Sequence, residues 1–221
     1  MEAFHQARQG LFSLDDPMLV KNEFASITDG SLYALSIGDD SEKDLYDHIG
    51  ESLPIRELIF RMITVSSNLA TNLLIERLTP ERTSRFMQEL GTNTVIVRRG
   101  VEDNQAFHIG LNNAATARGL MQILLKLAKH EVVSPQDSDV MIEILLQQKF
   151  NEMIPAQLPA NARVAHKTGW TGTYYHNAGI VYPPNSEPFV LVILTRGCKS
   201  ENEAQALIAS LAKKTYDNWT E

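Results

Sequence analysis

Two short polar clusters hold the side chains of this chain that could do chemistry. The first is Ser66-Ser67-Asn68, which follows an apolar helical pattern, and the second is His166-Lys167-Thr168-Gly169, at the end of an extended pattern. Both combine hydroxyl groups with an amide or an amine. The simpler interpretation is that Ser66 caps a helix and Lys167 is a solvated residue at a strand end. A solitary histidine such as His166 is typically a packing or hydrogen-bonding residue.

Other catalytic signatures are missing from the sequence. It contains no His-Glu-x-x-His, no cluster of Cys and His, no Gly-x-Ser-x-Gly and no glycine-rich phosphate loop. We therefore expect no metal ligands and no cofactor. The single cysteine, Cys198, excludes an internal disulfide.

Length, composition and charge narrow the class of protein further. The 221 residues, 43% of them hydrophobic, are enough to bury a full core. The net charge of -7 argues against binding to a nucleic acid backbone. No stretch is long and apolar enough to predict a membrane span, and the opening MEAFHQARQG lacks the features of a signal peptide.

Helical periodicity dominates the chain before residue 150. Met1, Phe4 and Ala7 share one face of an opening helix that ends at Gly10, and no capping residue precedes it. Residues 11–50 are polar and rich in turn residues, which predicts an ordered excursion. A helix is expected from Pro54 that stops at Val65-Ser66-Ser67, and a second one through Leu69, Leu73 and Leu74. Further helices are expected from Thr79, as N-cap, to Gly91, from about Thr116 to Ala128 and from Pro135 to Gln148, with a short extended piece at Val95–Val97.

After Pro159 the apolar pattern changes from helical to extended. It predicts an antiparallel meander of three strands and then a closing helix whose apolar face includes Leu207 and Leu211. The expected ranges are Arg163–Lys167, Tyr175–Tyr182 and Phe189–Thr195 for the strands and Asn202–Tyr216 for the helix. This order predicts an α+β fold, with a mainly helical domain over 1–160 and a second domain over 161–221 that holds the strands and the C-terminal helix.

Longer phrases around the two clusters resemble class A β-lactamases and related penicillin-recognising serine hydrolases. These phrases are Leu53–Leu58, Met62–Leu74 and His166–Gly169, and the resemblance extends over nearly all 221 residues. Members of that family combine Ser-x-x-Lys, Ser-Asp-Asn and Lys-Thr-Gly motifs. The resemblance implies a β-lactamase/transpeptidase-like fold, an all-helical domain plus an antiparallel sheet flanked by helices. It also implies a β-lactam or peptidoglycan-like small molecule as substrate, and a periplasmic or secreted location.

The resemblance assigns catalytic roles to residues of both clusters. Ser66 would pass a proton to the lactam nitrogen as the amide bond breaks. Asn68 would hold the side-chain amide of the substrate and orient a catalytic lysine. Lys167 would add positive potential for the substrate carboxylate and hydrogen-bond Ser66.

Three neighbouring residues are expected to bind the substrate. By the same resemblance, Thr168 would hold the substrate carboxylate through its hydroxyl, and Gly169 would let the strand edge approach the ligand. The backbone N–H of Trp170 would be one of two oxyanion donors.

The sequence departs from the family pattern at two places within the candidate site. Ser67 stands where the second motif carries an aspartate that braces the loop in the family. The substitution is therefore expected to affect the rigidity of the loop more than the catalytic chemistry. The family's Glu-x-x-Leu-Asn pattern is replaced by Arg98–Asn104. Glu102 is the best candidate for the deacylating base there, although a solvated loop residue is the alternative interpretation.

The third departure concerns the nucleophile. The family's Ser-x-x-Lys begins the helix whose end resembles residues 1–9, so we expect the nucleophilic serine to precede Met1. The formal match Ser210–Lys213 lies inside the closing helix and is interpreted as coincidental. The sheet would then lack its first two strands, and we expect self-association through the exposed edge of 189–195.

The sequence therefore predicts a β-lactamase-like serine hydrolase that is inactive as this chain alone. A D-alanyl peptidase or esterase of the same fold, and a non-catalytic remnant or binding module, remain as alternatives.

Overall fold

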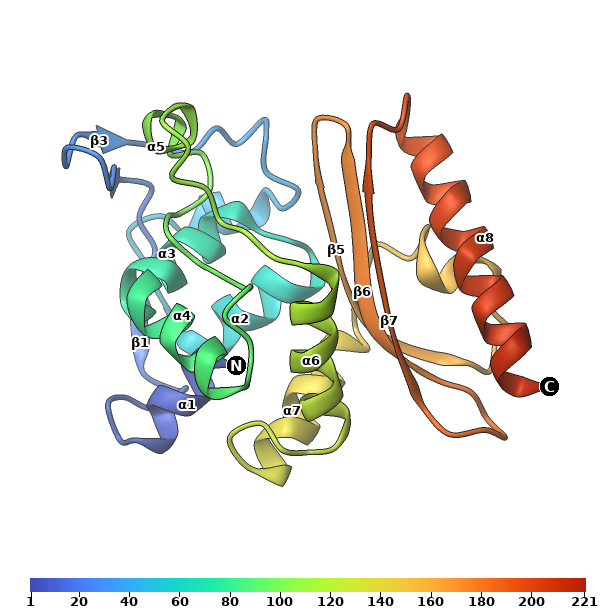
Figure 1. Cartoon of the computed structure of the whole chain (residues 1–221). Coiled ribbons are helices and arrows are strands. Elements are labelled where there is room, and N and C mark those ends of the chain that lie inside the picture. Colours follow the sequence, from blue (N-terminus) through green and yellow to red (C-terminus); the bar gives the residue numbers. More distant parts are fainter. The chain divides into compact units, whose positions relative to one another are not determined.

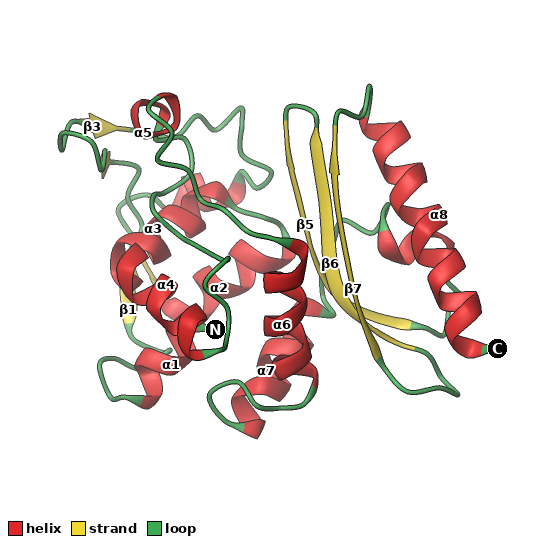
Figure 2. Cartoon of the chain, in the orientation of Figure 1, coloured by secondary structure: helices red, strands yellow, loops and turns green.

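A computed structural model describes all residues, 1–221, and shows helices with one larger sheet (Figure 1; Figure 2). The chain divides into two compact units, Met1–Thr116 and Ala117–Glu221. Each unit contains one of the two polar clusters.

The first unit is built from amphipathic helices. They are α1 (Glu2–Arg8), α2 (Ile55–Thr64), α3 (Asn68–Leu78), α4 (Pro80–Glu89) and the short α5 (Asn104–His108). Leu58 on α2 and Leu69 and Leu73 on α3 are fully buried, since the apolar stripe of each helix turns inward. The start of α4 follows the prediction, because the Thr79 hydroxyl accepts the Arg82 N–H at 3.4 Å.

The predicted excursion over 11–50, together with the residues up to 54, contains more regular structure than the sequence predicted. Strands β1 (Pro17–Leu19) and β4 (Ser52–Pro54) form one antiparallel pair, and β2 (Phe24–Ala25) and β3 (Leu32–Tyr33) form another. The 3₁₀ helix η1 (Asp44–His48) lies between β3 and β4. Three-residue strands give no alternating pattern long enough to recognise, so turn residues dominated the prediction.

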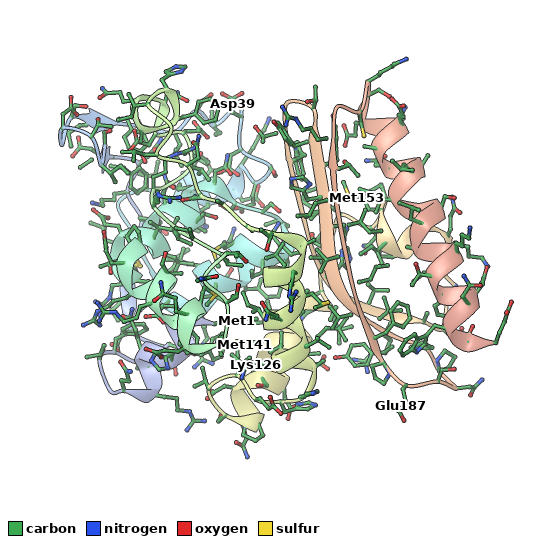
Figure 3. All side chains as sticks on the ribbon, viewed as in Figure 1. Met1, Asp39, Lys126, Met141, Met153 and Glu187 are labelled. Atoms are coloured by element: carbon green, nitrogen blue, oxygen red, sulfur yellow. The ribbon has the colours of Figure 1, made fainter.

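The second unit consists of an antiparallel sheet and its helices. The sheet has the order β5 (Arg163–Thr171), β6 (Tyr174–Tyr182), β7 (Phe189–Arg196), and this confirms the predicted meander. The helices are α6 (Ala117–Ala128), α7 (Pro135–Leu145), α8 (Glu201–Thr220) and the 3₁₀ helix η2 (Ile154–Gln157). One core cluster joins the sheet to α8 through Val164, Val181, Ile208 and Met153, the last of which is labelled in Figure 3.

Some predicted boundaries of the second unit were wrong. The first strand continues to Thr171, so Lys167-Thr168-Gly169 lies inside β5 and not at its end. Leu207 and Leu211 on α8 are 45% and 43% exposed, because the buried face of α8 is set by Ala204, Ile208 and Ala212. Helices α6 and α7 contact β7 and β5, and so belong to the compact unit of the sheet. The domain boundary that the sequence placed between residues 160 and 161 stays a prediction.

Candidate active site

The first polar cluster forms the turn between α2 and α3. Ser66 has a φ of 55°, a left-handed backbone conformation that is uncommon outside glycine. Ser67 is completely buried and is the N-cap of α3, where its hydroxyl accepts the Ala70 N–H at 3.2 Å. Asn68 is therefore the first residue of the helix, with its side chain free to reach a neighbouring loop.

That neighbouring loop carries Glu102. The Asn68 amide Nδ2 donates to Glu102 Oε1 at 3.1 Å and to the Asp39 carbonyl at 3.4 Å. The other carboxylate oxygen of Glu102 accepts the Ser36 N–H at 3.1 Å. Glu102 is half-buried and has a φ of 60°. The structure thus brings together Asn68 and Glu102, two of the predicted catalytic residues.

Asn72, one helical turn after Asn68, fixes the segment before Glu102. Its Oδ1 accepts the Val101 N–H at 2.7 Å and its Nδ2 donates to the Val101 carbonyl at 3.0 Å. A Cβ on Gly100 would lie 2.6 Å from Asn72 Oδ1, so the close approach of the loop requires glycine. Asn72 was not predicted from the sequence, although the i, i+4 repeat of asparagine in α3 was a usable signal.

The loop is also tied to the β2–β3 hairpin. Asp103 is buried, and its carboxylate accepts hydrogen bonds from the Ser26 hydroxyl at 2.8 Å, the Ile27 N–H at 3.0 Å and the Ala106 N–H at 3.1 Å. Asp103 therefore caps α5 while Glu102 beside it faces Asn68. Because the two acidic neighbours point to different partners, Glu102 is not simply part of a solvated acidic run.

The second cluster lies on β5, where the pleat separates its members. Lys167 and Gly169 lie on one face of the sheet, and Val164 and Thr168 lie on the face that packs against α8. The Lys167 ammonium donates to the Thr168 carbonyl at 2.8 Å. Burial lowers the pKa of Lys167 to about 8, so its ammonium group gives up a proton more readily than an exposed lysine does.

Thr168 and Trp170 differ in exposure. The Thr168 side chain is buried, and its hydroxyl makes no hydrogen bond within the protein. Trp170 is 47% exposed and packs edge-on against Phe150 at 5.4 Å between ring centroids. At Gly169, no heavy atom lies within 4 Å of where a Cβ would stand.

His166 is a buried structural residue. One ring nitrogen lies 3.1 Å from Asn151 Oδ1 and the other 3.2 Å from Asn177 Nδ2. Burial, and secondarily the charge of Lys167, lower its pKa to about 4, while the hydrogen bond with Asn177 opposes this shift. Because its ring is neutral and bonded at both nitrogens, His166 has the packing role that the sequence indicated.

The formal motif at Ser210–Lys213 has a different setting. Ser210 is exposed on α8, and Lys213 is paired with Asp217, with Nζ to Oδ1 at 2.5 Å. Helix α8 covers the sheet face opposite to Lys167. These positions support the interpretation of the motif as coincidental. No group of His, Cys, Asp and Glu side chains could hold a metal ion, and no helix is both long and apolar enough to cross a membrane.

Comparison with known proteins identifies the family. The model of the "Beta-lactamase enzyme family" matches residues 1–219. A β-lactamase of Streptomyces albus G is 30% identical over 169 residues, which are 73% of this chain and 53% of that protein. A β-lactamase of Streptomyces lavendulae is 29% identical over 68% of this chain and 51% of that protein. The chain therefore spans about half the length of these curated relatives.

Solved structures show the same fold. The structure of PBP-A matches with a TM-score of 0.83 at 24% identity, over 99% of this chain and 77% of that one. The β-lactamase of Sphaerobacter thermophilus DSM 20745 matches with a TM-score of 0.84 at 18% identity, over 99% and 79%. At these identities the likeness establishes the fold alone, which is the predicted β-lactamase/transpeptidase type. Together with the match of the family model over nearly the whole chain, it places this protein in the β-lactamase enzyme family.

Proposed function

We propose that this chain is the larger part of a serine β-lactamase-type hydrolase that opens β-lactam rings through an acyl-enzyme. The observation that carries the proposal is the pair Asn68 and Glu102, joined at 3.1 Å on a helix start and a loop that other residues hold in place. A carboxylate that accepts a hydrogen bond from an amide and is half-buried suits a general base for a deacylating water.

In the proposed reaction a serine oxygen attacks the lactam carbonyl, its proton passes to Ser66, and the C–N bond breaks. Ser66 delivers a proton to the departing nitrogen, and Lys167 supplies positive potential for the substrate carboxylate. Gly169 and the Trp170 N–H are proposed to bind the substrate at the free edge of β5. Thr168, whose buried hydroxyl makes no hydrogen bond within the protein, is proposed to bind it at the same edge, although its side chain lies on the opposite face of the sheet from Lys167. Water then attacks the ester carbonyl while Glu102 takes its proton, and Glu102 returns that proton to the serine oxygen as the ester C–O bond breaks.

The nucleophilic serine is proposed to lie on a segment that precedes residue 1 in the gene product. Two observations support this view. The chain matches about half the length of its curated relatives, and its own Ser-x-x-Lys on α8 has its lysine paired with Asp217. An in-frame Ser-x-x-Lys upstream of Met1 in the DNA, with a secretory signal before it, is the expected finding.

Intact-protein mass spectrometry with a penicillin tests the proposal. The complete gene product should gain the mass of the drug and then lose it as the ester hydrolyses, whereas the 221-residue chain alone should gain nothing. Replacement of the base, Glu102→Gln, should prolong the adduct about a hundredfold to ten-thousandfold. An adduct on the short chain, mapped to Ser66 or Ser210, would contradict the proposed location of the nucleophile.

The same measurement separates the alternatives. A wild-type adduct that persists, unaffected by Glu102→Gln, would indicate a D-alanyl peptidase or esterase of the same fold. Failure of the complete gene product to form any adduct would indicate a non-catalytic binding module.

A further inference from the structure

The turn that carries Ser66 and Asn68 lacks the carboxylate that the family motif places in its middle. Ser67 occupies this position, and its hydroxyl bonds only to the Ala70 N–H, at 3.2 Å, among the contacts that hold the turn. A hydroxyl at an N-cap satisfies one of the free N–H groups of a helix start. The two N–H groups before Ala70 therefore need another acceptor.

Asp40, in the loop between β3 and η1, supplies that acceptor. Its side chain is buried, with the residue 5% exposed. Oδ1 accepts the Asn68 N–H at 3.0 Å, and Oδ2 accepts the Leu69 N–H at 2.9 Å. The Tyr46 hydroxyl donates to Oδ2 at 3.1 Å, and the Glu42 N–H donates to Oδ1 at 3.1 Å. Four donors thus converge on one buried carboxylate.

All four N–H groups at the start of α3 are then hydrogen-bonded. The N–H groups of Asn68 and Leu69 go to Asp40, that of Ala70 goes to Ser67, and that of Thr71 begins the helical pattern by bonding the Ser67 carbonyl at 3.1 Å. A negative charge at a helix N-terminus is also favoured by the helix dipole. The turn is therefore braced by a residue 27 positions away from Ser67 in the sequence.

We propose that Asp40 is a positioning residue of the active site, which takes the place of the carboxylate that Ser67 lacks. The proposal rests on the proposed function for its catalytic consequence. Asp40 fixes the backbone of Asn68, and the carbonyl of the adjacent Asp39 accepts from the Asn68 side chain at 3.4 Å. Four residues earlier, the Ser36 N–H holds Glu102. One segment thus sets both members of the Asn68–Glu102 pair.

The excursion has several further ties to this half of the site. Tyr33 donates to the Val101 carbonyl at 3.4 Å and accepts from Asn72 at 3.3 Å. These bonds explain how a segment with few regular elements can hold a catalytic pair. Among these residues, Asp40 alone places a charged group against the backbone N–H groups of Asn68 and Leu69, the first two residues of α3.

The test compares Asp40→Asn with Asp39→Asn in the full 221-residue chain and in the complete gene product. The two variants remove the same charge from adjacent residues, but Asp39 is exposed and contacts Asn68 through its backbone carbonyl, which the substitution leaves in place. Hydrogen exchange at the amides of Asn68 and Leu69 should accelerate by about tenfold to a hundredfold in Asp40→Asn, since a hydrogen bond to a charged group is lost. It should stay within about twofold of wild type in Asp39→Asn. Unchanged exchange at both Asn68 and Leu69 in Asp40→Asn would overturn the proposal.

A rescue experiment separates a positioning role from general stability. Ser67→Asp restores a carboxylate to the motif, which can reach the N–H groups of Leu69 and Ala70 from the N-cap. In the Asp40→Asn background it should restore most of the penicillin acylation rate, whereas alone it should slow acylation, because two buried carboxylates then meet. Should Ser67→Asp leave the Asp40→Asn defect in acylation unrelieved while both variants stay folded, Asp40 would be an ordinary cap.

The two kinds of failure can be distinguished. Hydrogen exchange reports on Asp40 without any substrate, so it tests the positioning claim even if the protein never reacts with penicillin. Loss of acylation in the wild-type gene product would contradict the proposed function and leave the exchange result intact.

Discussion

Gly179→Ala should be among the most destabilising single changes in the second unit. Gly179 lies on β6 directly opposite His166 on β5. A Cβ at this position would stand 2.6 Å from His166 Cβ, 2.7 Å from the Ala165 carbonyl oxygen and 3.0 Å from His166 Cα. None of these atoms can rotate away, because two belong to the backbone and the third is bonded directly to it.

The magnitude follows from this rigidity. Inserting a methyl group into a well-packed core typically costs 1–3 kcal/mol. Relief here requires moving β5 away from β6, so we expect a loss of about 3 kcal/mol in the free energy of unfolding. Urea denaturation followed by circular dichroism measures it. A change of less than about 0.5 kcal/mol, the range of an ordinary surface substitution, would refute the reasoning.

Gly169→Ala is the matched control in the same sheet. Nothing lies within 4 Å of its Cβ position, and its backbone is not left-handed, so its stability should stay within about 0.5 kcal/mol of wild type. In the complete gene product the same variant should impair acylation by penicillin, because a methyl group would obstruct the proposed approach of the ligand to the strand edge. Gly179→Ala would then lower the stability of the fold, whereas Gly169→Ala would lower the acylation rate and leave the stability unchanged.

Three further predictions concern other parts of the molecule. Burial lowers the pKa of His166 from 6.5 to about 4, so between these values the unfolded chain binds a proton that the folded chain does not. The free energy of unfolding should therefore fall by up to about 3 kcal/mol as the pH drops from 6.5 to 4, and denaturant midpoints measured across this range should lose the pH dependence in His166→Gln. Asn72→Ala should cost about 1–3 kcal/mol and expose the Val101 segment to proteolysis, because both of the bonds to its backbone are lost; equal rates of cleavage in wild type and variant would contradict this role. The outer edge of β7 has no paired strand in the sheet, so the isolated chain should associate as its concentration rises, and light scattering that reports a concentration-independent monomer would count against this expectation.

Local sequence signals predicted the parts of the fold that local forces determine. Thr79 before Pro80 marks a helix start by capping, and the alternation after Arg163 marks strands by the side-chain period of two. The place of Ser66 and Asn68 between two helices followed from those signals, whereas Lys167 was predicted at a strand end and lies inside β5. Motif likeness then supplied their proposed roles.

The residues that position the site could not be predicted in the same way. Asp40 and Ser36 reach Asn68 and Glu102 from 28 and 66 positions away, and such contacts leave no periodic trace in the sequence. Glu102 was named only as a candidate, since a loop glutamate looks the same whether solvated or held. Asp103 shows the difference, because its three bonds are visible only once the β2–β3 hairpin is folded against the loop.

The left-handed backbone at Ser66 and Glu102, with φ of 55° and 60°, bears on how this protein would respond to laboratory evolution. A left-handed conformation costs about 1–2 kcal/mol for most residues and almost nothing for glycine. A selection for heat resistance that ignores activity should therefore recover glycine or asparagine at these two positions early. Each such gain would remove a proposed catalytic side chain, so the thermostable variants from that selection should be the least reactive toward penicillin.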